Sequence, residues 1–584
     1  MEEKKMTGYP SIDKPWLKYY SEEASNAKIP ECTMYDYIYD KNKEHLDDIA
    51  LIYFGHKISY GELFQNIHKA EAAFLAAGVK PGDVVSFISI TTPELVYCTY
   101  AINKIGAIAN MLDPRSSDKT LIHQISLAES KVLVILDQCQ EKLNAIRDQL
   151  SIDQAVLIEL KSSMGLPIKQ FFVIKTMFAQ KHNCQSQYVK WADFLARKGT
   201  EKHALLDDVG NASAFIWYTG GTTGEAKGVL LSNLNINSVA EQYRLIEKNP
   251  CRQQTWLTVS APFIAYSFIC GLHLPLALGL KCCIELYDPK AIADTIVKKK
   301  YNHAAVTPIV WENIIRNPKS NKVDFSFLVA PISGADYMNP KLEQEINDFF
   351  SAHNCEWKIC QGYGMTEVGS GVAVCSSNDH YKSGSVGIPF PHTTISTFDI
   401  DTGDELPTGE VGEICISGPS VMVGYYRNSD ATNTAIQTHK DGRNWMHTGD
   451  LGKIDSDGNL FITGRLKRMI TRYDGFKVFP AMIEEKIMMH DSIAKCCVVG
   501  QDDPRSEGGQ LPAAFLALQD TKNSEESVIE EIKQLCETVL PEYAWPVQYY
   551  IRDSIPLTPA GKIDYRVLEE KAKKYNHASK YREY

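Results

Sequence analysis

The sequence YTGGTTGEAKGV, residues 218–229, follows directly on the apolar run ASAFIW and contains four glycines, three threonines and a lysine. Glycines let backbone N–H groups face an anion, and the threonine hydroxyls and Lys227 add donors and charge. The spacing differs from a Walker A loop, because Lys227 follows an alanine, and from a dinucleotide fingerprint, because Thr219 occupies the first glycine position. The residues alone leave two interpretations open: a phosphate-binding loop, or a turn without a ligand.

Short apolar runs alternate with amphipathic helical patterns on both sides of this loop. Such alternation indicates parallel α/β sheets, in which ligands bind beyond the carboxyl ends of the strands. Three expected strands end in polar sequence with glycine: YTGGTTG, SGADYM and QGYGMTE. The expected strands are 83–90, 131–137, 213–219, 304–307, 325–333 and 357–364, with helices over 62–78 and 339–353.

After about residue 384 the turn signals come closer together, which predicts antiparallel β structure. A smaller α+β unit follows, with helices expected over 481–490 and 524–539 and strands over 494–500 and 512–519. We therefore predict an α/β protein. Residues 1–466 would form a large N-terminal domain of stacked, mostly parallel sheets with a small β-barrel-like subdomain. Residues 467–584 would form a smaller, mobile C-terminal domain.

Composition excludes several function classes. The chain has 584 residues, a net charge of -11 and an isoelectric point near 5.8, whereas a nucleic-acid binder usually shows a basic excess. The 15 cysteines include no C-x-x-C pair, which favours reduced cysteines in a cytoplasmic protein. The charged N-terminus predicts no signal peptide. The uncharged stretch 255–280 is interrupted by prolines, glycines and a histidine, so we expect a buried strand, turn and helix and no transmembrane helix.

Four further motifs carry side chains suited to nucleotide chemistry. In QGYGMTE (361–367), Tyr363 could stack on a base, Thr366 could donate to phosphate and Glu367 could bind magnesium. In WMHTGDLG (445–452), Asp450 could accept both ribose hydroxyls, although a plain Asx turn would look the same. ITGRLKRMITRYDGFKVFP (462–480) has five cations, and PLTPAGKIDYR (556–566) holds Lys562 on a stiff loop; a solvated surface would explain either one alone.

The order and spacing of these five motifs resemble the adenylate-forming acyl- and aryl-CoA synthetases, which include the 4-coumarate–CoA ligases and the firefly luciferases. The resemblance covers roughly residues 35 to 570. It implies a two-step reaction. A carboxylate attacks the α-phosphorus of ATP to give acyl-AMP and pyrophosphate, and the thiol of coenzyme A then attacks to give a thioester and AMP. It also implies Mg as the metal.

The resemblance implies a role for each matching residue. Thr222, Glu367 and Lys562 would be catalytic, and Thr222 and Glu367 would hold the metal. Tyr363 would lie along the adenine, and Asp450 and Arg465 would bind the ribose. The full ATP site would comprise Thr219, Gly220, Gly221, Thr222, Thr223, Gly224, Lys227, Gln361, Gly362, Tyr363, Thr366, Asp450, Arg465 and Lys562.

The same resemblance implies an acid pocket, a hinge and a coenzyme A site. Lys467 would be the hinge between the domains. The acid pocket would comprise Ile264, Ala265, Tyr266, Phe268, Ser333, Gly334, Ala335 and Gly362, and the thiol step would use Arg472, Tyr473, Gly475 and Phe476. Two departures from the family pattern stand out. Ala265 occupies a position where many relatives have histidine, and the stretch KRMITRYDGF is one residue longer than in the plant ligases.

The segment APFIAYSFICGLHL (261–274) contains no Asp or Glu to pair with a substrate ammonium, so we expect an uncharged fatty or aryl acid. Two alternatives remain: an acyl-AMP-forming ligase that loads a carrier-protein thiol, and a nucleotide-binding pseudoenzyme. The apolar segment 165–182, with three spaced lysines, predicts a packed helix; a peripheral membrane contact is the second interpretation.

Overall fold

The computed structural model describes residues 6–166, 168–170, 187–199, 207–219, 226–246, 251–259, 261–286, 288–375, 381–472, 474, 476–503, 509–519, 524–557 and 563–578. Five predicted site residues of the glycine-rich loop (220–224), together with Tyr473, Gly475 and Lys562, lie outside these ranges. Most of the apolar segment 165–182 also lies outside them.

An eight-stranded sheet forms the centre of the N-terminal part, in the order β19-β9-β8-β4-β3-β5-β6-β7. The six strands from β8 to β7 are parallel, while β9 and β19 are antiparallel additions at one edge. The strands are β3 (Val84–Ile88), β4 (Ile108–Leu112), β5 (Val132–Leu136), β6 (Gln154–Ile158), β7 (Tyr188–Lys190), β8 (Ser213–Thr219), β9 (Lys227–Ser232) and β19 (Gly424–Tyr425).

The helices that accompany this sheet have clear start and end signals in the sequence. Ser59 and Glu62 form a capping box at the start of α4, and α5 runs from Pro93 at its first turn to Gly106, whose φ is +87°. The helices are α1 (Pro10–Asp13), α2 (Glu22–Asn26), α3 (Met34–Asn42), α4 (Tyr60–Ala76), α5 (Pro93–Ile105), α6 (Asp118–Ala128), α7 (Gln140–Ile146), α9 (Trp191–Leu195) and α10 (Asn233–Ile246).

A four-stranded sheet packs beside it, in the order β10-β11-β1-β2, with β10 (Thr255–Val259), β11 (Lys281–Glu285), β1 (Ile49–Tyr53) and β2 (His56–Ser59). The uncharged stretch 255–280 supplies β10, then α11 (Ala265–Phe268), a π-helical turn (Ile269–His273) and α12 (Leu274–Ala277), so the prediction of strand, turn and helix is confirmed. Among the described residues, no helix combines the length and apolar character that crossing a membrane requires.

A third sheet, β12-β13-β14-β15-β16, carries two of the polar strand ends. Its strands are β12 (Ala305–Val306), β13 (Ile332–Ser333), β14 (Cys360–Tyr363), β15 (Ala373–Val374) and β16 (Ile388–Pro389), and the helices nearby in sequence are α13 (Pro289–Lys299), α14 (Pro308–Arg316) and α15 (Pro340–Ala352). The predicted strand 325–333 is wrong over most of its length. Phe325 and Leu328 are buried but lie in turns, because an apolar run reports burial and not backbone conformation.

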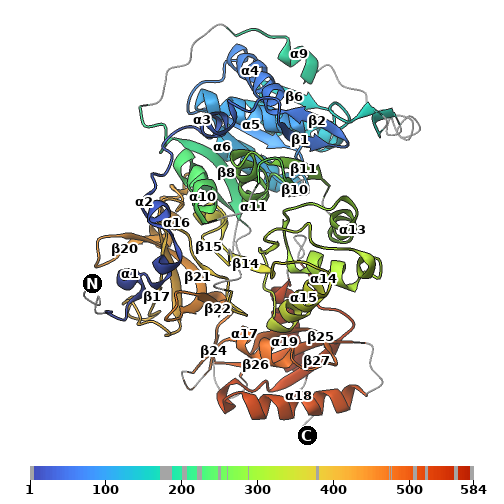
Figure 1. Ribbon diagram of the computed structural model, residues 1–584. Helices are drawn as coiled ribbons and strands as arrows, with labels where there is room; N and C mark the ends of the chain where they lie inside the picture. Colours follow the sequence, from blue (N-terminus) through green and yellow to red (C-terminus); the bar gives the residue numbers. More distant parts are fainter. Residues whose placement is uncertain are drawn as a thin grey trace.

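The predicted antiparallel structure after residue 384 is present as β17-β18-β21-β20, with β22 paired to β21. These are β17 (Thr394–Phe398), β18 (Gly412–Ser417), β20 (Ile436–Thr438), β21 (Asn444–Ile454) and β22 (Leu460–Arg465), with α16 (Ser429–Ala435) beside them. The N-terminal helix α1 packs on β17, so the start of the described chain lies beside this sheet (Figure 1).

The C-terminal part lies at one end of the molecule (Figure 1). It contains the hairpin β23 (Ile470–Thr471) and β24 (Lys477–Val478) and the sheet β25 (Ile493–Asp502), β26 (Gln510–Leu518) and β27 (Gln548–Arg552). Its helices are α17 (Pro480–Ile487), α18 (Glu525–Val539) and α19 (Tyr565–Ala578). Both predicted helices and both predicted strands of this part are confirmed.

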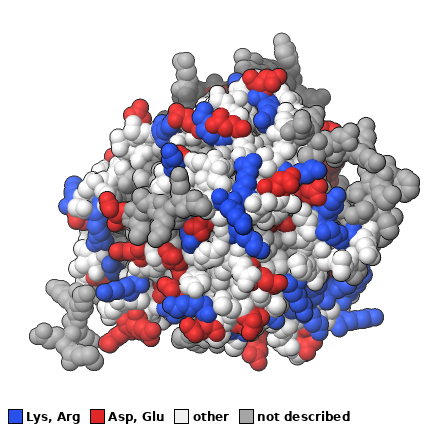
Figure 2. Space-filling model, turned by 90° about the horizontal axis from the view of Figure 1, so that it is seen from above, with Lys and Arg blue, Asp and Glu red and all other residues white. Residues whose placement is uncertain are grey.

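Cationic and anionic side chains are interspersed over the face drawn in Figure 2.

Two buried histidines make the stability of this fold depend on pH. His273 accepts from the Tyr100 hydroxyl at 2.9 Å and lies 3.0 Å from Asn237 Oδ1, and burial lowers its pKa to about 3. Burial likewise lowers the pKa of His303 to about 4. Both values lie below the ordinary histidine pKa of about 6.5, so the unfolded chain binds protons that the folded chain does not. Their contribution is complete above about pH 6.5 and is lost as the pH falls towards 3.

We expect His273→Gln to lower the melting temperature at pH 7.5, because it disturbs two buried hydrogen bonds. Between pH 7.5 and 5 the melting temperature of this variant should fall by less than that of the wild type. Calorimetric melting curves at both pH values measure this. His45→Gln, at an exposed histidine, is the control and should keep the wild-type dependence. If the melting temperature of His273→Gln falls as much as that of the wild type between pH 7.5 and 5, His273 is not a source of the pH dependence.

Candidate functional site

The glycine-rich loop is the connection of a β-hairpin. Thr219, the last residue of β8, pairs with Lys227, the first residue of β9, and residues 220–225 between them lie outside the described ranges. Trp217 on β8 donates from Nε1 to the Pro262 carbonyl at 2.8 Å, which ties this hairpin to the segment that leads into α11. This hydrogen bond therefore fixes the strand that leads into the glycine-rich loop relative to the start of the candidate acid segment.

Lys227 faces a residue that the sequence motifs did not single out. Its Nζ lies 4.7 Å from the centre of the Tyr425 ring on β19, a cation–π contact. The Tyr425 hydroxyl donates to Glu367 Oε1 at 3.0 Å. Tyr425 thus bridges the lysine of the hairpin and the carboxylate of QGYGMTE. Its hydrogen-bond partner lies 58 residues away in the sequence, so no local motif marks this role.

Glu367 lies in the short 3₁₀ turn Thr366–Val368, directly after β14 and Gly364. It is 6% exposed, and burial raises the pKa of its carboxyl, an effect that the Tyr425 hydrogen bond and the charges of Arg465 and Lys227 oppose. A buried carboxylate with two cations nearby is an arrangement that a further cation would stabilise in its ionised form.

Asp450 is the second buried carboxylate of the site. It is 3% exposed, its Oδ2 accepts from the Tyr363 hydroxyl at 2.8 Å, and its Oδ1 lies 2.8 Å from Arg465 Nε. Asp450 and Arg465 are also direct partners in the pairing of β21 with β22. Burial and the charge of Asp450 hold the pKa of Tyr363 well above its ordinary value, so Tyr363 is a neutral donor. A carboxylate accepts about four hydrogen bonds, so these two contacts alone do not use the full acceptor capacity of Asp450.

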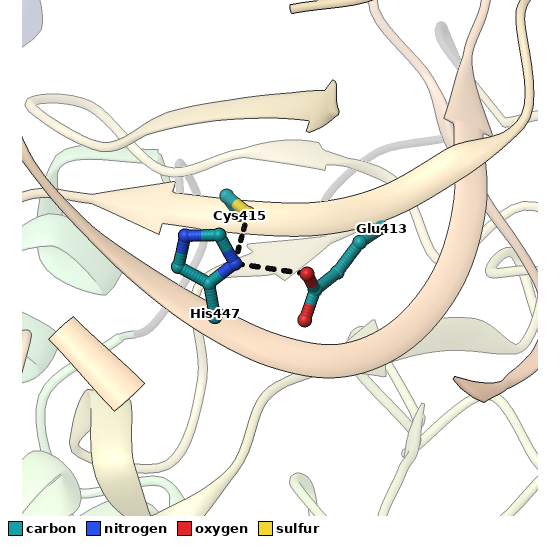
Figure 3. A group of neighbouring side chains, drawn as sticks. All are labelled: Glu413, Cys415 and His447. Carbon is teal, nitrogen blue, oxygen red and sulfur yellow. Dashed lines mark hydrogen bonds and ion pairs between the residues drawn. The ribbon is translucent and has the colours of Figure 1, made fainter. Parts of the chain in front are cut away.

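Glu413, Cys415 and His447 form a cluster on β18 and β21, the second of which also carries Asp450 (Figure 3). Glu413 Oε2 pairs with His447 Nδ1 at 2.8 Å, and Oε1 accepts from the backbone N–H of Gly449 at 3.0 Å. The three side chains offer ligand atoms within 4.8 Å of one another, a metal-like grouping. However, both Glu413 oxygens and His447 Nδ1 already have hydrogen-bond partners. We therefore interpret the cluster as a brace for the turn, where Gly449 has φ of +68°.

The candidate acid-pocket residues come from α11 and from the ends of β13 and β14. Tyr266 lies near Gly334 and Gly362, since a Cβ added at Gly334 would be 3.6 Å from the Tyr266 hydroxyl and 3.7 Å from the Gly362 carbonyl. Phe268 is buried against Phe215 on β8, with ring centroids 4.8 Å apart. Ala265 and Ser333 are also buried, Gln361 is buried beside them in the sheet, and Ile264 and Ala335 are exposed.

Lys467, Arg472 and Phe476 are the described residues among those predicted for the hinge and the thiol step. Lys467 occupies the 3₁₀ turn Leu466–Arg468 that follows β22. Arg472 and Phe476 lie on the β23–β24 hairpin of the C-terminal part, where Arg472 Nη1 donates to the Tyr543 carbonyl at 3.3 Å and Phe476 stacks on the Tyr543 ring. Tyr473, Gly475 and Lys562 are among the residues that the structure does not describe.

Comparison with known proteins gives relatives along nearly the whole chain. The long-chain-fatty-acid–CoA ligase of Bacillus subtilis is 25% identical over 574 residues, covering 97% of this chain and 99% of its own. The 4-coumarate–CoA ligase CCL1 of Humulus lupulus is 28% identical over 531 residues, covering 88% and 89%. The fatty-acid and aryl-acid ligases are thus about equally similar to this chain.

Solved structures confirm the fold. The anthranilate CoA ligase AuaEII in complex with anthranoyl-AMP superposes with a TM-score of 0.79 at 19% identity, over 95% of this chain and 99% of that chain. ATP-bound MatB from Rhodopseudomonas palustris gives the same TM-score at 22% identity, over 94% and 100%.

Two family models match the sequence. The model described as "AMP-binding enzyme" matches residues 38–426, and the one described as "AMP-binding enzyme C-terminal domain" matches residues 482–562. The first covers more than half of the chain, and the resemblance inferred from the five motifs is confirmed: this chain belongs to the family of AMP-binding, adenylate-forming enzymes.

Proposed function

We propose that this protein activates an uncharged carboxylic acid with ATP, through an acyl-AMP intermediate, and transfers the acyl group to the thiol of coenzyme A. One observation supports this most strongly. Lys227, Tyr363, Glu367, Asp450 and Arg465 come from four motifs across more than 200 residues of sequence. Their side chains lie in two contact groups, Lys227–Tyr425–Glu367 and Tyr363–Asp450–Arg465, and the charge of Arg465 acts on Glu367, so the two form one electrostatically linked group. That group combines the cations, carboxylates and aromatic ring that a nucleotide triphosphate requires.

In this proposal the two buried carboxylates have different tasks. Asp450 would accept the ribose hydroxyls, while Tyr363 and Arg465 orient its carboxylate. Glu367, with Thr222, would hold a magnesium ion, which would supply positive charge against the ATP phosphates. The raised pKa of Glu367 fits this donor set, because a hard cation favours the ionised carboxylate.

The protein would accelerate adenylation mainly by positioning and charge stabilisation. Lys227 would offset the negative charge that grows on the leaving pyrophosphate, and Tyr425 would keep Lys227 and Glu367 at a fixed separation. Lys562 would bridge the substrate carboxylate and the α-phosphate, as the family resemblance implies. Thr366 and Gln361 would contribute to the same nucleotide site.

We place the hinge at Lys467, with residues 1–466 and 467–584 as the two moving parts. Arg465 bonds backward to Asp450 in the N-terminal part. Arg468 bonds forward, to Glu484 and to the Val498 carbonyl at 3.0 Å, and its guanidinium lies 5.4 Å from the Tyr565 ring centre. The chain is therefore anchored on either side of residues 466–467, and a rotation about the backbone of these residues would move the two anchors relative to each other.

The first experiment is a pyrophosphate-release screen over medium-chain, long-chain and cinnamate-type acids and amino acids, with and without coenzyme A. We expect release with an uncharged acid and thioester formation with free coenzyme A. Fastest turnover with an amino acid would contradict the acid class. Acyl-AMP formation without transfer to coenzyme A would favour a carrier-protein thiol as the acceptor, and nucleotide binding without release would favour a pseudoenzyme.

A second experiment separates the two half-reactions. Lys562→Ala should slow acyl-AMP formation about 10³-fold, because its charge acts where negative charge builds, and should spare thioester formation from supplied acyl-AMP. Gly475→Leu should leave pyrophosphate release nearly unchanged and block the thiol step, because the added side chain would fill the path of the pantetheine. Loss of the same half-reaction in both variants would refute the assignment of these residues to different steps.

A third experiment tests the brace behind Asp450. Glu413→Ala removes the acceptor for Gly449 N–H and the partner of His447, so we expect ATP affinity to fall about tenfold, equivalent to about 1.4 kcal/mol. Glu413→Gln should retain most of the affinity, because the amide oxygen can still accept from Gly449. Isothermal titration with ATP measures the effect, and Glu410→Ala, at an exposed neighbour, is the control. Equal ATP affinity in Glu413→Ala and wild type would contradict the bracing role of Glu413.

A further inference from the structure

His447 has a second ring nitrogen that the brace around Glu413 does not use. Its Nδ1 faces Glu413, and its Nε2 lies on the opposite side of the ring and points away from that carboxylate (Figure 3). There the Nε2 atom lies 2.9 Å from Nε2 of His439, the residue that directly follows β20. Two imidazole nitrogens thus face each other across the β20–β21 hairpin.

The contact with Glu413 determines which nitrogen of His447 carries the proton. An ionised carboxylate only accepts hydrogen bonds, so the 2.8 Å contact places the proton on Nδ1 and leaves a lone pair on Nε2. Histidines that bind a metal almost always donate their other ring N–H in this way. The contact fixes the tautomer and raises the basicity of the ligating nitrogen.

The ring of His439 is held in place by buried aromatic neighbours. It packs edge-on against Phe398, with ring centroids 4.5 Å apart, and lies 6.2 Å from the centre of the Trp445 ring. The backbone N–H of His439 donates to the Arg443 carbonyl at 3.0 Å, and its own carbonyl accepts from Gly442 at 2.9 Å. The backbone and the ring contacts together fix the direction in which His439 Nε2 points.

The charges around His439 favour a bound cation. Three carboxylates act on its ring with negative charge, those of Asp441, Glu413 and Glu405. Burial and the charge of His447 lower the pKa of His439, so its imidazole is neutral at pH 7. The neighbouring cations Lys440 and Arg443 are each paired with an aspartate.

A hydrogen bond between two neutral histidines would also explain a distance of 2.9 Å. Tetrahedral zinc binds imidazole nitrogens at about 2.0–2.1 Å, which sets two such ligands roughly 3.3 Å apart. The pair would therefore have to open by only about 0.4 Å to take the ion. His439 would shift its proton to Nδ1, which changes its tautomer and not its charge. Both histidines are partly exposed, so an ion and water can reach them.

We propose that His439 and His447 form a binding site for a transition-metal dication such as Zn²⁺, with Glu413 as the carboxylate that orients His447. Two nitrogen ligands leave the other positions of a tetrahedral ion to water. Imidazole suits zinc, copper and nickel, whereas magnesium takes oxygen ligands, so this site is chemically distinct from the one proposed at Glu367. The proposed acid activation does not depend on it.

The test is isothermal titration of the metal-free, full-length enzyme with Zn²⁺ at pH 7.5, with Mg²⁺ present in excess. We expect His439→Gln to weaken zinc binding at this site at least tenfold, because glutamine offers no imidazole nitrogen. Its amide can still donate to His447 Nε2, so the hairpin keeps a hydrogen bond. Glu413→Ala should weaken zinc binding about 10- to 100-fold, because it releases the tautomer of His447.

Two control variants remove side chains that could bind zinc elsewhere. His45→Gln changes an exposed histidine, and Cys251→Ser changes an exposed free thiol. Both should leave the zinc affinity of the hairpin site unchanged. Melting temperatures measured without metal confirm that each variant is folded.

The outcomes decide between a metal site and a hydrogen bond. Equal zinc affinity in wild type and His439→Gln would overturn the proposal, and so would a wild type without a titratable zinc site. A site that is lost in His439→Gln, weakened in Glu413→Ala and retained in both controls supports it. Pyrophosphate release tests the proposed acid activation separately, so that function stands or falls independently of the zinc result.

Discussion

The buried carboxylate of Asp450 is the point on which the arrangement of the site depends. A charge that is 3% exposed is costly unless it is paired, and here Tyr363 and Arg465 supply the partners. Tyr363 ends a strand of one sheet, and Asp450 and Arg465 belong to another. Satisfying one carboxylate therefore joins two sheets, and it does so where the chain leaves β22 towards the C-terminal part.

The ion pairs between the N-terminal part and the segment proposed to move lie at the surface. The contacts between the two parts include Lys341 with Asp491 at 2.6 Å and Lys477 with Asp401 at 2.7 Å, and in both pairs the aspartate is largely exposed. Exposed ion pairs contribute little to stability and are readily exchanged for water. The buried bonds of Arg468 within the C-terminal part are of a different kind, since they would persist through a rotation. The proposed rotation would break these exposed ion pairs and leave the buried bonds of Arg468 intact.

The sequence predicts a structural feature well when the residues that cause it are neighbours in the chain. Alternating patterns identify β3, β5, β8 and α4, and Asp450 and Glu367 are found because each sits in a motif with its own turn. Tyr425 and Glu413 act through partners 58 and 36 residues away, so no local pattern points to them. The strand expected over 325–333 fails for a related reason. Burial of Phe325 and Leu328 depends on the helices packed around them, and a buried turn and a buried strand have the same composition.

The acid pocket shows where motif reasoning ends and structural reasoning begins. The absence of acidic residues in 261–274 argues against an ammonium substrate, yet it says nothing about a hydroxyl, because tyrosine and serine look unremarkable in an apolar stretch. The fold adds what the sequence lacks, because it buries the Tyr266 hydroxyl without a hydrogen-bond partner among the described residues and places it 3.6 Å from the position that a Cβ on Gly334 would take. A buried hydroxyl without a partner costs about 1–3 kcal/mol. The polarity of the pocket therefore depends on contacts between α11 and the ends of β13 and β14, which no local sequence pattern reports.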